Sequence, residues 1–187
     1  MYGTSDFKKG LKILVKGEPC VILDFQHIKP GKGNQFTRTK LKNLITGTNL
    51  DLTCRSGEKF GIPDIVYKTL SYIYKSGDHF HFMDSKTYET LDINKEIVGS
   101  AGNYLTENLE VSACFFNDQP ISIEVPKSLI LKVIKTEPGF KGNTVSRATK
   151  PATVETNLVV QVPLHINEGD RLKINTEDGA YIERVSQ

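Results

Sequence analysis

Residues 21–44, VILDFQHIKPGKGNQFTRTKLKNL, predict the element that decides the fold of the N-terminal third of the chain. The first eight residues of this stretch are rich in β-branched and aromatic side chains, which favour a strand. The cluster KPGKGN at residues 29–34 follows them and has the glycine and proline that tight turns require. A second strand then runs from Gln35 towards Leu44. We therefore predict a long β-hairpin whose tip projects from the body of its domain.

The rest of the chain has the same pattern of short strands separated by turn residues. Strands are predicted at residues 65–75, 79–82, 111–116, 121–125, 129–135, 158–162, 171–176 and 180–185. A glycine-rich loop is predicted at residues 138–150. The alternation of aromatic side chains predicts that four of them face a core: Tyr72, Tyr74, Phe80 and Phe82.

One helix is predicted at residues 94–108, where Ile97, Ala101 and Leu105 recur at four-residue spacing. The chain is therefore mainly all-β. Strands this short and this closely spaced are typical of small barrels. We predict three small barrels of SH3-like or OB type, at residues 1–63, 64–127 and 128–187, with boundaries at Pro63 and Pro126.

The net charge of +2 conceals a strong asymmetry along the chain. Residues 1–64 carry a net charge of +5, residues 65–127 a net charge of −4, and residues 128–187 a net charge of +1. No acidic residue occurs between Phe25 and Leu50, a stretch with five lysines and arginines. A segment of one sign indicates a polyanion as partner, although a solvated basic surface has the same composition.

The tip of the predicted hairpin places Lys32 between Gly31 and Gly33. A phosphate-binding P-loop is not indicated, because the lysine is followed by glycine and a strand instead of Ser or Thr and a helix. The two glycines leave Lys32 without a neighbouring side chain. Such a lysine suits insertion into a narrow site or modification by another enzyme. An ordinary exposed turn lysine is the alternative.

No sequence motif of catalysis or metal binding is present, so neither an enzyme nor a cofactor is predicted. The three cysteines are scattered, which indicates buried free thiols in a reducing compartment. No apolar run approaches the roughly 20 residues of a membrane span. A signal peptide is not indicated either, because it needs a continuous apolar segment and lysines interrupt the apolar stretch at residues 11–15. We expect a cytoplasmic monomer that does not contact a membrane.

Several stretches closely resemble the bacterial elongation factor P family. The resemblance begins with HIKPGKG at residues 27–33 and RTKLKNL at residues 38–44. It includes YIY at 72–74, HFM at 81–83 and QPI at 119–121. The most specific part is C-terminal: TEPGFKGNT at 136–144, KPAT at 150–153, VPL at 162–164 and EGD at 168–170. The resemblance covers essentially the whole chain.

This resemblance implies an L-shaped, tRNA-like molecule with an N-terminal KOW/SH3-like barrel followed by two OB folds. It implies a non-enzymatic translation factor that binds the 70S ribosome between the P and E sites. There it would contact rRNA and the P-site tRNA and relieve stalling at consecutive prolines. Proline reacts poorly in a crowded site, and a bound factor can help by fixing the geometry of the tRNA ends.

The resemblance also assigns roles to particular residues. Lys32 corresponds to the tip lysine, which in many members is extended by β-lysylation through a lysine-modifying enzyme. Three neighbours form its loop: Pro30, Gly31 and Gly33. Basic residues of the same hairpin are the candidates for tRNA and rRNA contact: Lys29, Arg38, Lys40 and Lys42. A C-terminal loop that lies near the mRNA in the family corresponds to Gly142, Asn143 and Thr144.

One departure from the family falls in that C-terminal loop. Members usually have Gly-Asp-Thr where this chain has Asn143 between Gly142 and Thr144. Asparagine keeps a hydrogen-bonding amide and loses the negative charge, which puts the codon contact in doubt and lowers repulsion from phosphate. Three alternatives remain open beside the main form: an elongation factor P-like paralogue, a general OB-fold RNA-binding protein, and an enzyme whose active site is assembled from distant residues.

Overall fold

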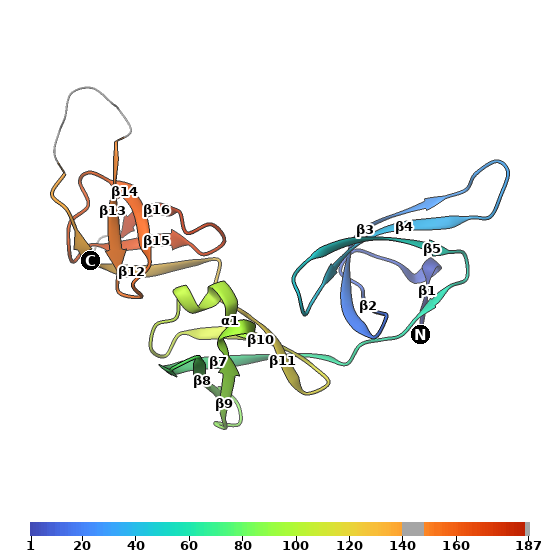
Figure 1. Ribbon diagram of the computed structural model, residues 1–187, viewed down its shortest axis with the longest axis horizontal. Coiled ribbons are helices and arrows are strands. Elements are labelled where there is room, and N and C mark those ends of the chain that lie inside the picture. Colours follow the sequence, from blue (N-terminus) through green and yellow to red (C-terminus); the bar gives the residue numbers. More distant parts are fainter. Residues whose placement is uncertain (140–147, 186–187) are drawn as a thin grey trace. The chain divides into compact units, whose positions relative to one another are not determined.

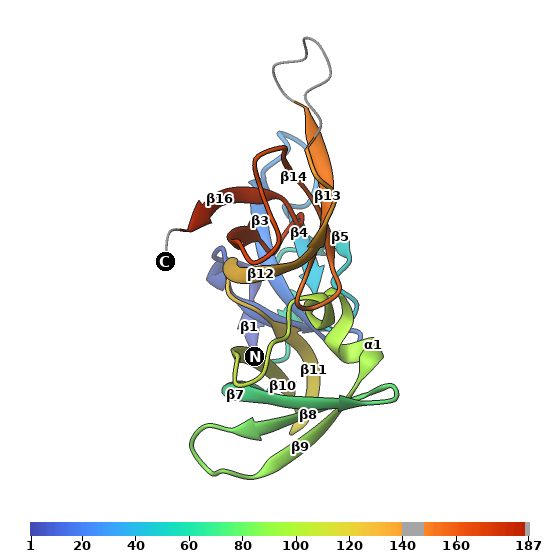
Figure 2. The ribbon, with the colours of Figure 1, turned by 90° about the vertical axis from the view of Figure 1, so that its left-hand side faces the viewer.

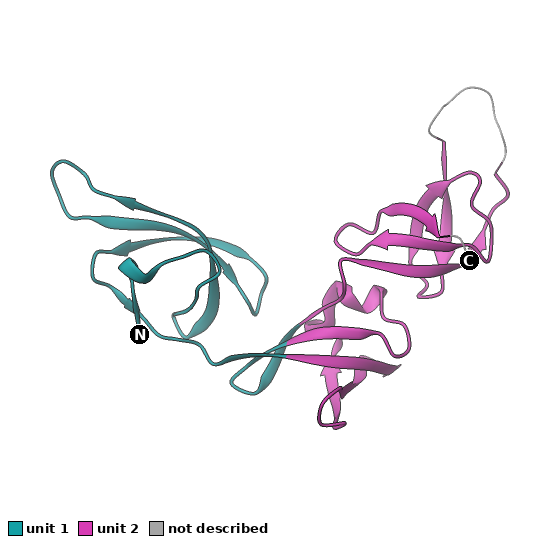
Figure 3. Ribbon diagram, turned by 180° about the vertical axis from the view of Figure 1, so that it is seen from behind, with its two compact units in different colours: residues 1–67, 114–122 teal, residues 68–113, 123–187 magenta. Residues whose placement is uncertain are grey.

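The structure is a computed structural model that describes residues 1–139 and 148–185. Strands dominate it, and its curled sheets form parts of barrels, which confirms the prediction of an all-β chain (Figure 1). The residues of the chain form two compact units, defined by the contacts among them (Figure 3). The first comprises residues 1–67 and 114–122, and the second residues 68–113 and 123–187. The domain boundaries at Pro63 and Pro126 stay a prediction.

The N-terminal segment forms a four-stranded antiparallel sheet with the strand order β2-β3-β4-β5. Its strands are β2 (Lys12–Val15), β3 (Glu18–Ile28), β4 (Phe36–Asn43) and β5 (Asn49–Arg55). A second, two-stranded sheet pairs β1 (Tyr2–Gly3) with β6 (Lys59–Phe60), and the 3-10 helix η1 (Thr4–Asp6) follows β1. Apolar side chains from both sheets form one buried core, which includes Ile13, Ile22, Leu41 and Phe60.

The middle segment forms a five-stranded sheet with the order β11-β10-β7-β8-β9. Its strands are β7 (Ile65–Ser76), β8 (His79–Asp84), β9 (Thr90–Asn94), β10 (Glu110–Phe116) and β11 (Gln119–Glu124). Figure 2 shows β7, β8 and β9 side by side. Phe80 and Phe82 are buried as predicted, and the ring of Tyr72 lies against both.

The prediction that Tyr74 faces the core is wrong. Its side chain is exposed and stacks on the ring of His81, with ring centroids 4.3 Å apart. The cause is a register shift in the pairing of β7 with β8 between Tyr72 and Tyr74. Such a bulge breaks the two-residue alternation on which the prediction depended.

The predicted helix at residues 94–108 is much shorter than expected. Only α1 (Lys95–Val98) is α-helical, and the 3-10 helix η2 (Gly99–Asn103) continues it. The side chain of Asn94 caps α1 by accepting a hydrogen bond from the Glu96 N–H. Gly99 ends α1 with φ of 55° and ψ of −139°, a conformation outside the right-handed helical region.

The C-terminal segment forms a five-stranded sheet with the order β14-β13-β12-β15-β16. Its strands are β12 (Ser128–Thr136), β13 (Thr149–Val154), β14 (Val159–Pro163), β15 (Arg171–Asn175) and β16 (Tyr181–Val185). Ten buried residues form its core. Nine of them belong to this segment, and the tenth is Tyr104, from the chain that follows η2. The predicted loop at 138–150 is too long at its end, because β13 begins at Thr149.

Candidate nucleic-acid interface

The hairpin of β3 and β4 presents a fully exposed tip. The last cross-strand pair is Ile28 with Phe36, and residues 29–35 between them are all exposed. On its other edge β4 pairs with β5 as far as Phe36 and Arg55, and the Ser56 N–H donates to the Gln35 carbonyl at 3.2 Å. β4 is therefore an interior strand along its whole length, and only the tip extends beyond the sheet.

Lys32 lies at the centre of this tip, with Gly31 and Gly33 beside it. Gly33 has φ of 116°, which a residue with a side chain rarely adopts. A Cβ atom added at Gly31 would meet no heavy atom within 4 Å. Within residues 1–139 and 148–185, no hydrogen bond or ion pair involves the Lys32 ammonium. Lys29 and Pro30 are exposed on the same tip. The side chain of Lys32 is therefore accessible to a partner surface.

The basic residues of β4 all lie on one face because burial alternates along this strand. Arg38, Lys40 and Lys42 are exposed, and the residues between them are buried. The buried positions include two threonines, and the Thr37 hydroxyl lies 2.8 Å from Nδ1 of His27. Both threonines thus belong to the interior although they are polar. The three basic side chains consequently point away from the core together.

Lys40 is the least available of these three cations. Cross-strand pairing places it opposite Asp24 of β3 and opposite Asp51 of β5. Asp24 also binds the Lys9 ammonium at 3.1 Å. That hydrogen bond lowers the pKa of the Asp24 carboxyl, and the charge of Lys40 adds to the effect. The carboxylates on both sides of Lys40 therefore oppose the approach of phosphate to it.

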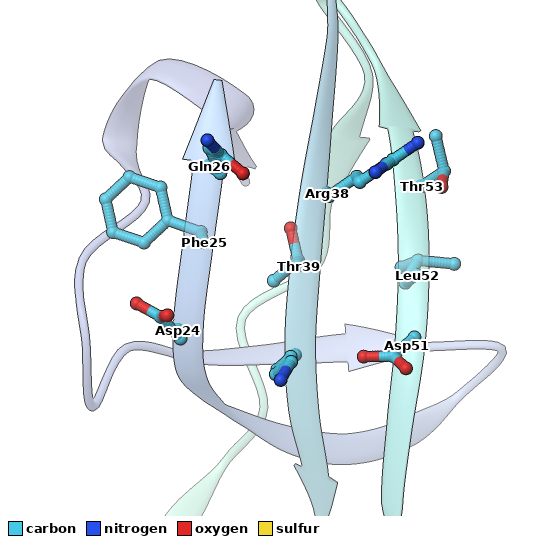
Figure 4. A pocket seen from close by; sticks show the side chains of 9 residues that line it. Asp24, Phe25, Gln26, Arg38, Thr39, Asp51, Leu52 and Thr53 are labelled. Atoms are coloured by element: carbon cyan, nitrogen blue, oxygen red, sulfur yellow. The ribbon is translucent and has the colours of Figure 1, made fainter. Parts of the chain in front are cut away.

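Arg38 and Lys42 have no carboxylate directly opposite on either neighbouring strand. Arg38 pairs with Gln26 and Thr53, and Lys42 pairs with Val21 and Asn49. In Figure 4 the side chain of Arg38 extends from β4 towards Thr53 on β5. The side chains of β3, β4 and β5 around it line an open hollow of about 390 Å³.

The sequence did not reveal the role of the two aspartates. The acid-free stretch from Phe25 to Leu50 ends at Asp24 on one side and at Asp51 on the other. Strand pairing then brings both of them to Lys40, near the middle of the basic strand. The predicted hairpin left this pairing open, because it depends on the register of the two strands, which pair last at Ile28 and Phe36.

A second hollow, of about 470 Å³, lies beside the base of the tip. Its lining is rich in hydroxyl groups and includes Ser5, Thr37 and Ser56, together with His27 and Lys29. Hydroxyls and a cation are suited to hydrogen bonding with phosphate oxygens. No local sequence pattern indicates this hollow, because η1 and Ser56, which follows β5, contribute to it from distant parts of the chain.

The remaining predicted site residues, Gly142, Asn143 and Thr144, lie outside the described residues. Their flanks are fixed: the Lys150 ammonium donates to the Glu137 carbonyl at 2.6 Å, and Gly139 packs closely against Leu164.

Acidic, histidine and cysteine side chains in residues 1–139 and 148–185 form no group of three or more that could hold a metal ion. Over the same residues, no helix has both the length and the apolar character needed to cross a membrane.

Comparison with known proteins gives matches along the whole chain. The KOW-like domain of elongation factor P matches residues 3–60, its OB domain residues 65–123, and its C-terminal domain residues 129–184. Elongation factor P of Bdellovibrio bacteriovorus is 56% identical over 187 residues, which is the full length of both chains. That of Nitratidesulfovibrio vulgaris strain DP4 is 47% identical over 184 residues, 98% of this chain and 100% of its own.

Solved structures show a related fold. Eukaryotic translation initiation factor 5A from Methanococcus jannaschii matches with a TM-score of 0.54 and 26% identity. The match covers 66% of this chain and 91% of that one. The sequence matches confirm the resemblance found in the motifs, and they extend over all three segments of the chain. The chain therefore belongs to the elongation factor P family of translation factors.

Proposed function

We propose that this protein binds the 70S ribosome in the cytoplasm, between the P and E sites, and stimulates peptide-bond formation at consecutive prolines. The tip of the β3–β4 hairpin points towards the CCA end of the P-site tRNA. The protein holds the peptidyl-tRNA in a productive geometry and provides no catalytic group of its own. Restricting the motion of the tRNA ends lowers the entropic part of the barrier.

The observation that carries this proposal is the setting of Lys32. It is exposed, flanked by two glycines, and without a hydrogen bond or ion pair in the described parts of the chain. An interior strand supports the loop from which it extends. A side chain that is exposed on a well-supported loop can enter a narrow ribosomal site at little cost to folding.

The same setting suits Lys32 as the substrate of a lysine-modifying enzyme. Acylation of its amine by β-lysine would lengthen the side chain and add hydrogen-bond donors. Mass measurement of the intact native protein tests this directly, since β-lysylation adds the mass of one lysyl residue.

Arg38, Lys42 and Lys29 form the proposed contact with tRNA and rRNA phosphates, with a smaller contribution from Lys40. Their exposed cations lie on the tip and on one face of β4. Phosphate contacts of this kind position a protein without reading the base sequence. In this proposal the loop that contains Gly142, Asn143 and Thr144 lies near the mRNA.

The decisive experiment measures peptide formation on a message encoding consecutive prolines. We expect Lys32→Ala to abolish the stimulation, and its melting temperature to stay at the wild-type value because an exposed tip residue contributes little to stability. Lys32→Arg keeps the charge but lacks the amine that is acylated, so we expect it to be nearly inactive if the site is modified.

Lys16→Ala is the matched control, because Lys16 lies in the turn between β2 and β3 of the same sheet, outside the proposed contact surface. We expect it to be fully active. Full activity of Lys32→Ala would overturn the proposal, whereas full activity of Lys32→Arg would overturn only the modification. Failure of the wild-type protein to co-sediment with ribosomes would favour a general RNA-binding protein instead.

A further inference from the structure

Tyr88 is an exposed aromatic residue in a strained backbone conformation. It lies in the turn between β8 and β9, where its φ is +60° and its side chain is 73% exposed. A bulky side chain in this left-handed region is a genuine outlier, because its Cβ approaches the following carbonyl oxygen. An exposed ring gains nothing from burial in the core that would offset this strain.

Most other positions with positive φ follow the usual rule. Nine glycines have positive φ, and so do four Asn or Asp residues, which tolerate this region: Asn108, Asn117, Asp118 and Asn157. Besides Tyr88, the exception is Lys16, in the turn between β2 and β3. Among the described residues with positive φ, Tyr88 is the only aromatic one. A glycine or asparagine would fit this turn better, so the stability of the fold does not explain a tyrosine here.

The turn holds Tyr88 firmly in place. Asp84 accepts hydrogen bonds on Oδ1 from the N–H groups of Lys86 at 2.8 Å and Thr87 at 3.2 Å. The Tyr88 N–H donates to the Asp84 carbonyl at 2.9 Å, and the Asp84 N–H donates to the Glu89 carbonyl at the same distance. Strain that the surrounding hydrogen bonds maintain in this way occurs most often at sites with a function.

We infer that Tyr88 is the anchor of a docking surface for a basic protein, where an arginine of the partner packs over its ring. This inference rests on the proposed ribosomal function, because the ribosome supplies such proteins. Exposed tyrosines are frequent anchors of protein interfaces, and arginine is the cation that most often packs on aromatic rings.

Charge favours a protein partner over RNA. The segment of residues 65–127 that contains Tyr88 has nine acidic and five basic residues. Next to Tyr88 in sequence is Glu89, and Lys86 is the one basic residue in the turn at 85–89. The net charge of −4 repels phosphate and attracts a basic protein surface.

The test compares the affinity of purified 70S ribosomes for wild-type protein and for three variants at position 88. Tyr88→Gly and Tyr88→Asn remove the ring and suit positive φ, so we expect binding to weaken about tenfold while the melting temperature stays equal or rises. Tyr88→Phe keeps the ring and should bind within about twofold of wild type. Asn157→Gly is the matched control, a glycine placed at positive φ in another hairpin turn, and should bind as wild type does.

A second measurement identifies the partner. Tyr88 is replaced by the photoreactive residue p-benzoyl-L-phenylalanine, and the ribosome-bound protein is crosslinked. We expect the crosslinked product to be sensitive to protease and resistant to ribonuclease, and to map to a basic segment of a ribosomal protein. A crosslink to rRNA would overturn the assignment of a protein partner.

Other outcomes separate this inference from the function on which it rests. Wild-type affinity in Tyr88→Gly and Tyr88→Asn would overturn the docking surface and leave the proposed function intact. A lower melting temperature in Tyr88→Gly would show that the ring serves the fold, which also overturns the inference. If the wild-type protein itself fails to bind ribosomes, both proposals fall together.

Discussion

Neutralising the basic residues of β4 one at a time should separate them into two classes. Arg38→Gln and Lys42→Gln should each weaken ribosome binding and reduce its salt dependence. Lys40→Gln should do neither to a measurable extent, although all three cations lie on one face of one strand. The reason is the pairing of Lys40 with Asp24 on one side and Asp51 on the other.

Coulomb's law gives the size of the difference. A phosphate about 4 Å from the Lys40 ammonium gains about 1 kcal/mol in water. Two carboxylates about 7 Å from the same phosphate cost about 0.6 kcal/mol each, so the sum is close to zero. Arg38 and Lys42 have no carboxylate directly opposite, so their attraction to phosphate is not offset in this way.

The assay is a titration of labelled protein with 70S ribosomes at several salt concentrations between about 50 and 200 mM. Each lost phosphate contact lowers the slope of the logarithm of affinity against the logarithm of salt by about 1. We therefore expect a slope reduced by about 1 for Arg38→Gln and for Lys42→Gln, and an unchanged slope for Lys40→Gln.

The complementary variant is Asp51→Asn, which removes one repulsive charge and leaves the shape of the side chain nearly unchanged. Binding should tighten about threefold, corresponding to about 0.6 kcal/mol. Equal losses of slope for all three cations would refute the reasoning, and so would weaker binding by Asp51→Asn. Melting temperatures of the four variants confirm that the fold is intact.

Two further predictions concern stability. Hydrogen bonds, first from the Lys86 N–H, lower the pKa of Asp84 in the folded state. Its contribution to the free energy of unfolding is therefore present above about pH 4 and lost as the pH falls through the folded-state pKa. Denaturant titrations should show that the loss of stability in Asp84→Asn becomes smaller over that range, and a loss independent of pH would contradict this. A Cβ at Gly139 would lie 2.5 Å from the Leu164 carbonyl oxygen, so Gly139→Ala should lower the free energy of unfolding by about 1–3 kcal/mol. Gly31 has open space around it, so Gly31→Ala should change the free energy of unfolding by less than about 0.5 kcal/mol. Similar unfolding curves for these two variants would contradict this prediction.

Local patterns in the sequence predicted the class of the fold and most strands. The β-branched run before the KPGKGN cluster and the alternation of Phe80 and Phe82 are features of neighbouring residues, and the structure confirms both. The predicted helix at 94–108 was too long because the four-residue spacing of apolar residues was given more weight than Gly99. The positive φ of Gly99 ends α1. Tyr74 was misplaced because a bulge cannot be recognised from alternation alone.

The candidate site could be predicted in part. Lys32 and its glycines are adjacent in sequence, so their placement at one tip followed directly from the turn residues. The different environments of Arg38 and Lys40 depend on which residues of β3 and β5 lie opposite, and register is a property of the paired strands. The strain at Tyr88 likewise comes from hydrogen bonds to Asp84 that no local propensity indicates.

The burial of Tyr104 in the C-terminal core bears on how this protein could be shortened or recombined. A gene truncated before Ser128 would remove the other nine buried residues of that core and leave an aromatic ring from the middle segment uncovered. Grafting the C-terminal segment alone onto another protein would leave a void where the ring had been. These two parts of the chain therefore do not behave as freely exchangeable modules, and a compensating polar substitution at Tyr104 would have to accompany any loss of the last 60 residues.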